Sequence, residues 1–113
     1  MAIIKTYTDI QQSEKLAEIL PIKSADMYYW CGEDLRIGGH KAMDKDYDIP
    51  CWSLAALLSV LSFPALRYDI EDGEGGWIVG CEKNDKMYLS YYRDNPVDTC
   101  YEMILKLHEQ NLL

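Results

Sequence analysis

The sequence predicts an α+β fold, a single domain over residues 1–113 in which a three-stranded antiparallel meander packs against about three helices. Apolar residues recur at helical spacing in three segments, near residues 10–20, 50–61 and 96–107. Between residues 65 and 92 the spacing changes to two, which is typical of strands. A hairpin across residues 27–37 is a candidate N-terminal extension of the same sheet.

Capping and breaking residues mark the helices. Residues 8–11 (TDIQ) have the spacing of a capping box, so we expect Thr8 and Gln11 to begin the first helix. A second helix is expected to begin around Pro50, because proline suits a first helical turn. It is apolar almost all round up to residue 61, which indicates the centre of the core and makes Leu57 and Leu58 structural. The last helix has the start signals Asn95, Pro96 and Asp98.

Alternation predicts which side chains of the meander face the helices. Three sets are expected on that side, one from each strand: Leu66, Tyr68 and Ile70; Trp77, Val79 and Cys81; and Met87, Leu89 and Tyr91. A tight turn at Asn84 and Asp85 joins the last two strands.

Composition excludes several classes of function. Nineteen acids against eleven bases give a net charge of -8, which argues against a nucleic-acid partner. The longest apolar stretch is far shorter than the ~20 residues that span a bilayer, and residues 1–6 do not resemble a signal peptide. We therefore expect a cytoplasmic protein with no membrane partner.

Cysteine spacing predicts neither a metal site nor a cofactor site. The four cysteines lie 20, 30 and 19 residues apart, without the close pairs of metal centres, so we expect all four as buried apolar residues: Cys31, Cys51, Cys81 and Cys100.

Four segments resemble a known family. They are residues 7–9 (YTD), 24–27 (SADM), 49–58 (IPCWSLAALL) and 97–104 (VDTCYEMI). In this order they resemble short uncharacterised proteins from the genomes of gut Bacteroides, their phages and mobile elements. The resemblance covers nearly the whole chain and implies a bacterial host with a mobile-element setting. The family has no assigned activity, so no site is carried over.

Cys51 is the candidate for chemistry. In the first turn of a helix its pKa would be lowered, as in cysteine hydrolases, which also need a histidine base. The chain offers His40 and His108, neither on a predicted strand. A cysteine-dependent hydrolase is therefore the alternative function, and a buried core residue is the simpler interpretation.

Charged and glycine-rich segments have structural interpretations as well. Residues 73–76 (GEGG) lack the spacing of a phosphate loop and read as a hairpin loop. A small basic cluster (Arg36, His40, Lys41) could bind an anion or balance nearby acids. Asp44, Asp46 and Asp48 resemble the start of a calcium loop but lack its glycine and closing glutamate. Together with a second acidic group (Asp69, Glu71, Asp72, Glu74), they leave an acidic DNA mimic that inhibits host defence as a further alternative.

Aromatic residues suggest a partner surface. Nine tyrosines accompany one phenylalanine, and tyrosine suits a half-wet surface. Alternation places Tyr88, Tyr92 and Ile78 away from the helices, on the open side of the meander. The sequence therefore predicts a small protein-binding or accessory protein that contacts another protein or a second copy through these side chains.

Overall fold

The computed structural model describes residues 5–71, 73–92 and 95–113. Its helices are α1 (Ile10–Ile19), a short 3-10 helix η1 (Ile22–Ser24), α2 (Leu54–Val60) and α3 (Pro96–Glu109). Its strands are β1 (Met27–Trp30), β2 (Asp34–Ile37), β3 (Ile49–Cys51), β4 (Ala65–Glu71), β5 (Glu74–Lys83) and β6 (Lys86–Tyr92). The predicted α+β class is confirmed.

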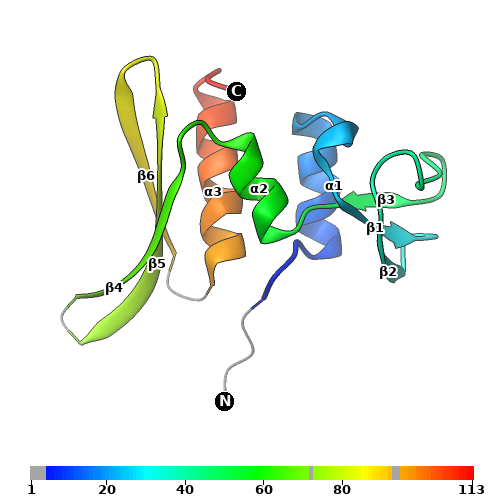
Figure 1. The fold of residues 1–113 in the computed structure, drawn as a ribbon, viewed down its shortest axis with the longest axis horizontal. Coiled ribbons are helices and arrows are strands. Elements are labelled where there is room, and N and C mark those ends of the chain that lie inside the picture. Colours follow the sequence, from blue (N-terminus) through cyan, green and yellow to red (C-terminus); the bar gives the residue numbers. More distant parts are fainter. Residues whose placement is uncertain (1–4, 72, 93–94) are drawn as a thin grey trace.

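The strands form two separate antiparallel sheets. The meander is confirmed, with the order β4-β5-β6. The predicted hairpin also forms, as β1 and β2, but it does not extend the meander. It lies in a second sheet of order β2-β1-β3, because β1 pairs with β2 on one side and with β3 on the other. The helices lie between the two sheets (Figure 1).

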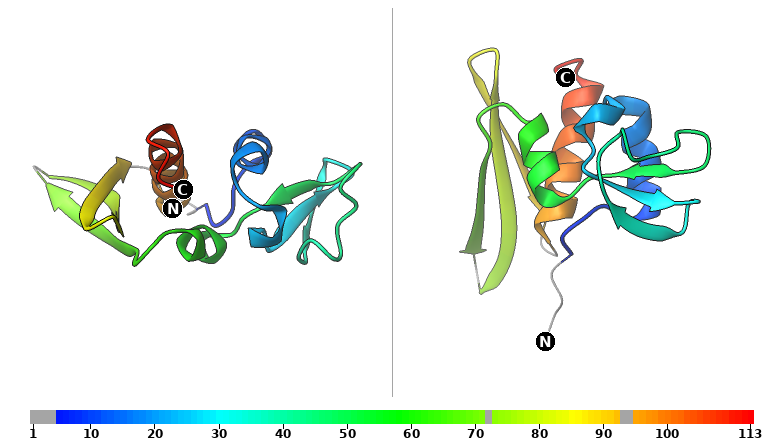
Figure 2. Two further views of the ribbon diagram at one scale, coloured as in Figure 1. Left: turned by 90° about the horizontal axis from the view of Figure 1, so that it is seen from above. Right: turned by 45° about the vertical axis from the view of Figure 1, so that its right-hand side comes forward.

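The helices cover only one side of the meander. α3 packs against β5 and β6, α2 packs against α3, and α1 packs against β3. Both views of Figure 2 show the two sheets at opposite ends of the molecule with the helices between them. The Cα atoms extend only 18 Å in the shortest direction, so the molecule is thin and the meander is its outermost element at one end (Figure 1).

Two helix starts differ from the prediction. Asp9, not Thr8, caps α1, and Gln12 completes the capping box. α2 begins at Leu54 after the cap Ser53, not at Pro50, because Pro50 is paired with β1 as part of β3. The start of α3 is confirmed, with Asn95 as the cap and Pro96 in the first turn. The carboxylate of Asp98 accepts a hydrogen bond from the side-chain amide of Asn95.

The core lies between α3, α2 and the inner side of the meander. Leu57 of α2 is fully buried, as predicted, whereas Leu58 is only partly buried against the cluster. α3 supplies the largest share of the core, through its fully buried residues Val97, Cys100, Met103, Ile104 and Leu107. These side chains fix α3 on one side of the meander and leave the other side to solvent.

Candidate functional site

The side of the meander that faces away from α3 is the candidate site, and we call it the open face. No helix lies on this side in Figure 1. Three large apolar side chains of β6 are exposed there: Met87 at 63%, Leu89 at 57% and Tyr91 at 44%. Ile78 of β5 pairs with Tyr91 and is half-buried on the same side. Together they make a continuous apolar surface, which monomeric proteins rarely leave exposed without a use.

Two glycines of β5 let the side chains of β6 lie flat across the open face. A Cβ on Gly80 would stand 3.1 Å from Cδ2 of Leu89 and 3.5 Å from the sulfur of Met87. A Cβ on Gly76 would collide with the hydroxyl of Tyr91. Leu89 and Tyr91 therefore lean over the neighbouring strand, and the apolar surface is broader than one strand.

Short or charged residues of β4 form the border of the open face. Ala65 pairs with Gly80, and Arg67 pairs with Ile78, so both lie on the open side. Arg67 Nη2 lies 3.7 Å from a carboxylate oxygen of Asp69, and both side chains are largely exposed. The open face is thus apolar along β6 and carries small or charged residues along β4.

The prediction of which β6 residues face outward is wrong. Tyr88 is partly buried and packs against the core, whereas Met87, Leu89 and Tyr91 are outside. The two-residue turn at Asn84 and Asp85 sets Lys83 opposite Lys86, and therefore Cys81 opposite Tyr88. Paired residues share a face, so Tyr88 must lie inside with Cys81.

Only Ile78 of the three predicted partner residues is shown on the open side. The backbone of Tyr92 pairs with Trp77, but its side chain lies outside the described residues. The sequence could have placed Met87, Leu89 and Tyr91 on the open face, because the length of the turn sets which residues of β5 and β6 are paired.

Cys51, the alternative candidate, is enclosed. It lies in β3, not in a helical turn, and is fully buried as the core interpretation predicts. Its thiol donates to the carbonyl of Thr8 at 3.4 Å and accepts from the Thr8 hydroxyl at 3.5 Å. Burial raises its pKa above the ordinary thiol value, and neither His40 nor His108 forms a hydrogen bond with it. This environment favours the neutral thiol, which is the unreactive form.

Polar contacts around Cys51 are structural. The Thr8 hydroxyl lies 2.7 Å from the hydroxyl of Ser13, and both residues are fully buried. The Tyr29 hydroxyl donates to the Thr8 carbonyl at 2.6 Å, and burial raises the pKa of Tyr29. The cluster therefore joins β1, β3 and the start of α1.

The prediction that all four cysteines are buried holds for three. Cys51, Cys81 and Cys100 are buried, but Cys31 is exposed. Cys31 begins the turn between β1 and β2 with a φ of 53°, and its amide donates to the Asp48 carboxylate at 2.8 Å. The turn directs its side chain outward.

The two acidic groups lie at opposite ends of the molecule, in the loop before β3 and at the β4–β5 hairpin (Figure 1). In the first, Asp48 is buried and accepts from the amides of Cys31 and Asp44, while Asp44 accepts from the amide of Asp46. These carboxylates organise a loop. Among the described residues, no group of three histidine, cysteine or acidic side chains could hold a metal ion. Asp72 of the second group lies outside the described residues.

The glycine-rich and basic segments have structural contacts. The chain turns at Gly73, with a φ of 80°, between β4 and β5, but the predicted hairpin loop over residues 73–76 is wrong beyond Gly73, because β5 already begins at Glu74. Gly75 and Gly76 belong to β5. In the basic cluster, the guanidinium carbon of Arg36 lies 4.7 Å from the ring centroid of Trp30, a cation–π contact across the first hairpin.

No family model matches the chain, and neither a curated protein nor a solved structure matches it. No helix in the described ranges is long and apolar enough to cross a membrane.

Proposed function

We propose that this is a protein-binding protein and that the open face docks a second copy of the same chain. The observation that carries the proposal is the exposure of Met87, Leu89 and Tyr91 on a sheet face without a covering helix. Aromatic residues, methionine and arginine are enriched at protein interfaces, and tyrosine is among the residues that contribute most to binding. Their spread over Gly76 and Gly80 provides the flat surface that two sheets need to pack.

The pattern across the strands favours a copy of the same chain. One row of the open face runs from Ala65 through Gly80 to Leu89, from small to large. A two-fold axis along β5 would set Leu89 of each copy over Ala65 of the other. The next row, with Arg67 and Tyr91 at its ends, would bring each guanidinium to the partner's ring. Such self-complementarity is what a symmetric dimer requires.

The two alternative functions have less support. The thiol of Cys51 is buried, its pKa is raised, and it has no histidine partner, so a hydrolase would need a rearranged core. The two acidic groups lie at opposite ends of the molecule (Figure 1), whereas the imitation of a DNA backbone needs negative charges in one continuous stripe.

We also infer that the protein has no nucleic-acid partner, which the net charge of -8 supports. A cytoplasmic location is inferred from the apolar stretches of the sequence, which are shorter than ~20 residues. An origin among gut Bacteroides and their mobile elements rests on the sequence resemblance alone.

Sedimentation equilibrium of Leu89→Asp against the unmodified chain tests the proposed dimer. We expect the unmodified chain to dimerise in a concentration-dependent way and Leu89→Asp to stay monomeric, because the substitution places a charge in the apolar contact. Ile37→Asp is the matched control, since Ile37 is 87% exposed on the other sheet. Circular dichroism confirms that both variants fold.

The salt dependence of binding distinguishes a second copy of the chain from a foreign basic protein. Two copies of charge -8 repel each other, so added salt should strengthen their association. A basic partner protein would bind more weakly in salt. A chain that stays monomeric at every concentration and ionic strength, or a dimer that survives Leu89→Asp, overturns the proposal.

A further inference from the structure

A second site lies far from the open face, in a pocket of about 840 Å³ where the ends of several elements meet. Its walls are the C-terminal end of α1 with η1, the outer side of α2, the last residue of β5 and the C-terminal end of α3. This volume lies within the range of pockets that hold small organic ligands, roughly 300–1,000 Å³. The open face and the pocket share no residue.

The floor of the pocket is apolar. It is formed by Leu20 and Ala56 of the core, by Ile19 and Val60, which pack against the core, and by the exposed Pro21 and Leu113. A chain of several methylene groups, or a ring, could lie against these side chains and be shielded from water.

The rim of the pocket is basic. Lys23, Lys83 and His108 line it, and none of the described lining residues is an aspartate or a glutamate. This contrasts with a chain in which acids outnumber bases by nineteen to eleven. Both serines of the lining are hydrogen-bonded. Ser24 accepts from the indole nitrogen of Trp52 at 2.9 Å and donates to the Pro21 carbonyl at 2.6 Å, and Ser59 donates to the Ala55 carbonyl at 2.9 Å.

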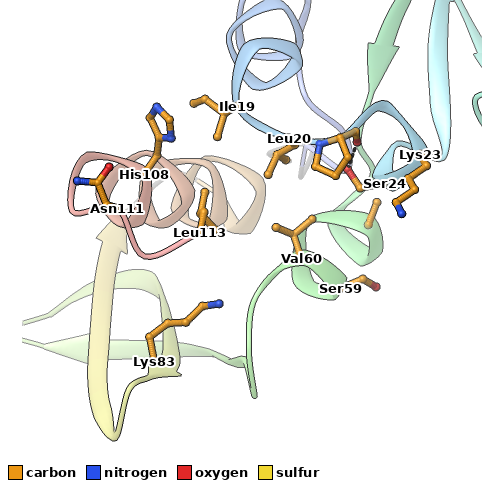
Figure 3. Close-up of a pocket in the computed structure, with 12 residues that line it drawn as sticks. Ile19, Leu20, Lys23, Ser24, Ser59, Val60, Lys83, His108, Asn111 and Leu113 are labelled. Carbon is orange, nitrogen blue, oxygen red and sulfur yellow. Dashed lines mark hydrogen bonds between the residues drawn. The ribbon is translucent and has the colours of Figure 1, made fainter.

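Lys83 is the best placed of these basic groups. It ends β5 and is half-buried, and Figure 3 shows its side chain extending from the strand into the space below Val60 and Leu113. Its ammonium group forms no hydrogen bond or ion pair with the part of the chain that the structure describes. A cation in this position is stabilised by an anion that reaches the same space.

We propose that this pocket binds a small organic anion with an apolar body, its charged group at Lys83 and its apolar part over Leu20 and Val60. Charge complementarity selects the anion, and the apolar floor selects against small inorganic ions. The chemical class includes medium-chain carboxylates and aromatic acids. The proposal does not depend on the open face.

Titration calorimetry with octanoate, 1-octanol and acetate tests both halves of the proposal. We expect saturable binding of octanoate, weaker binding of octanol because it lacks the charge, and no measurable binding of acetate because it lacks the apolar body. Lys83→Met should weaken octanoate binding about tenfold or more, the usual effect of losing a charge-assisted hydrogen bond. Lys15→Met is the matched control, because Lys15 is an exposed lysine of α1 outside the pocket.

A second variant covers the case in which Lys83→Met perturbs the fold. Ser59 is exposed on α2 and lines the pocket, so Ser59→Trp should fill the space and abolish octanoate binding without disturbing the core. Leu89→Asp should leave octanoate binding unchanged, which separates this site from the open face. The proposal is overturned if octanoate shows no saturable binding, if octanol binds equally well, or if Lys15→Met weakens binding as much as Lys83→Met.

Discussion

Thr8 and Trp52 are joined by two hydrogen bonds, although they are 44 positions apart in the chain. The Thr8 amide donates to the Trp52 carbonyl at 3.0 Å, and the Trp52 amide donates to the Thr8 hydroxyl at 3.2 Å. Both residues are fully buried. The pair fixes the segment before α1 to the connection between β3 and α2, and so joins the second sheet to the helices.

Replacing Thr8 with valine should lower the free energy of unfolding by about 2–3 kcal/mol, because the buried Trp52 amide and the Ser13 hydroxyl each lose a partner. Urea denaturation measures this change. Thr6→Val is the matched control, since Thr6 is exposed, and it should shift stability by no more than about 0.5 kcal/mol. Equal effects of the two substitutions would show that the hydroxyl of Thr8 contributes nothing specific.

Residues 8–12 show why local spacing predicts the helix but not its first residue. Both Thr8 with Gln11 and Asp9 with Gln12 fit a capping box. The structure uses Asp9 and Gln12, because the Thr8 hydroxyl is already committed to Trp52 and Ser13. That choice depends on contacts with residue 52, which sequence spacing does not reveal.

The two adjacent leucines of α2 should differ in their cost of truncation. Leu57 is fully buried, so Leu57→Ala should cost about 2–5 kcal/mol through the cavity it leaves. Leu58 is partly exposed, and Leu58→Ala should cost less because its space is partly filled by water. Thermal or urea unfolding of the two variants checks the order, and a larger effect at Leu58 would contradict the packing of α2.

The start of α2 and the facing of β6 were mispredicted for different reasons. Pro50 fits both a first helical turn and a strand, and only pairing with Tyr28 of β1 decides for the strand. The facing of β6 was predictable, because a two-residue turn at Asn84 and Asp85 sets Cys81 opposite Tyr88. Alternation alone does not say which set of alternate residues faces the helices, because β6 has apolar or aromatic residues in both sets.

The pocket could not be predicted from the sequence. The pocket is lined by four segments that are distant in the chain, from the end of α1 to the residues after α3. None of these segments has a motif, and Lys23 and Lys83 are ordinary lysines in the sequence. Only the packing of α2 and α3 brings them to one rim.

Lys5 joins the starts of α1 and α3, and this contact makes stability depend on pH. Its ammonium donates to Asp98 at 3.0 Å, to Asp9 at 3.1 Å and to Gln12 at 2.7 Å. Burial alone would raise the pKa of Asp98, but hydrogen bonds from Gln12, Lys5 and Asn95 outweigh it and hold this pKa below its ordinary value of 3.8. The ionised carboxylate is therefore the form that the fold stabilises.

Asp98→Asn should lower the free energy of unfolding by about 1–2 kcal/mol at pH 7, where the native carboxylate is charged. A carboxyl whose pKa is lowered by folding stabilises the native state above its unfolded pKa and loses this effect as pH falls through the folded pKa. The difference between variant and unmodified chain should thus be constant above about pH 5 and shrink below pH 4. Urea midpoints from pH 7 to pH 2.5 measure it.

The exposed Asp34 supplies the control for this pH dependence. Asp34→Asn should leave the acid limb of the stability curve unchanged. An Asp98→Asn curve parallel to that of the unmodified chain at every pH would show that the contact with Lys5 does not stabilise the ionised form.

Thiol reactivity should single out Cys31. It is the exposed cysteine, whereas Cys51, Cys81 and Cys100 are buried, and burial raises the pKa of each of these three, that of Cys100 to about 12. Because the thiolate is the reactive form, an aromatic disulfide reagent at pH 8 should label one thiol rapidly in the native chain and all four in urea. Cys31→Ser should abolish the rapid phase. If a rapid phase persists and Cys51→Ser removes it, the β3 thiol reaches solvent as a nucleophile, and the hydrolase alternative regains support over the binding function.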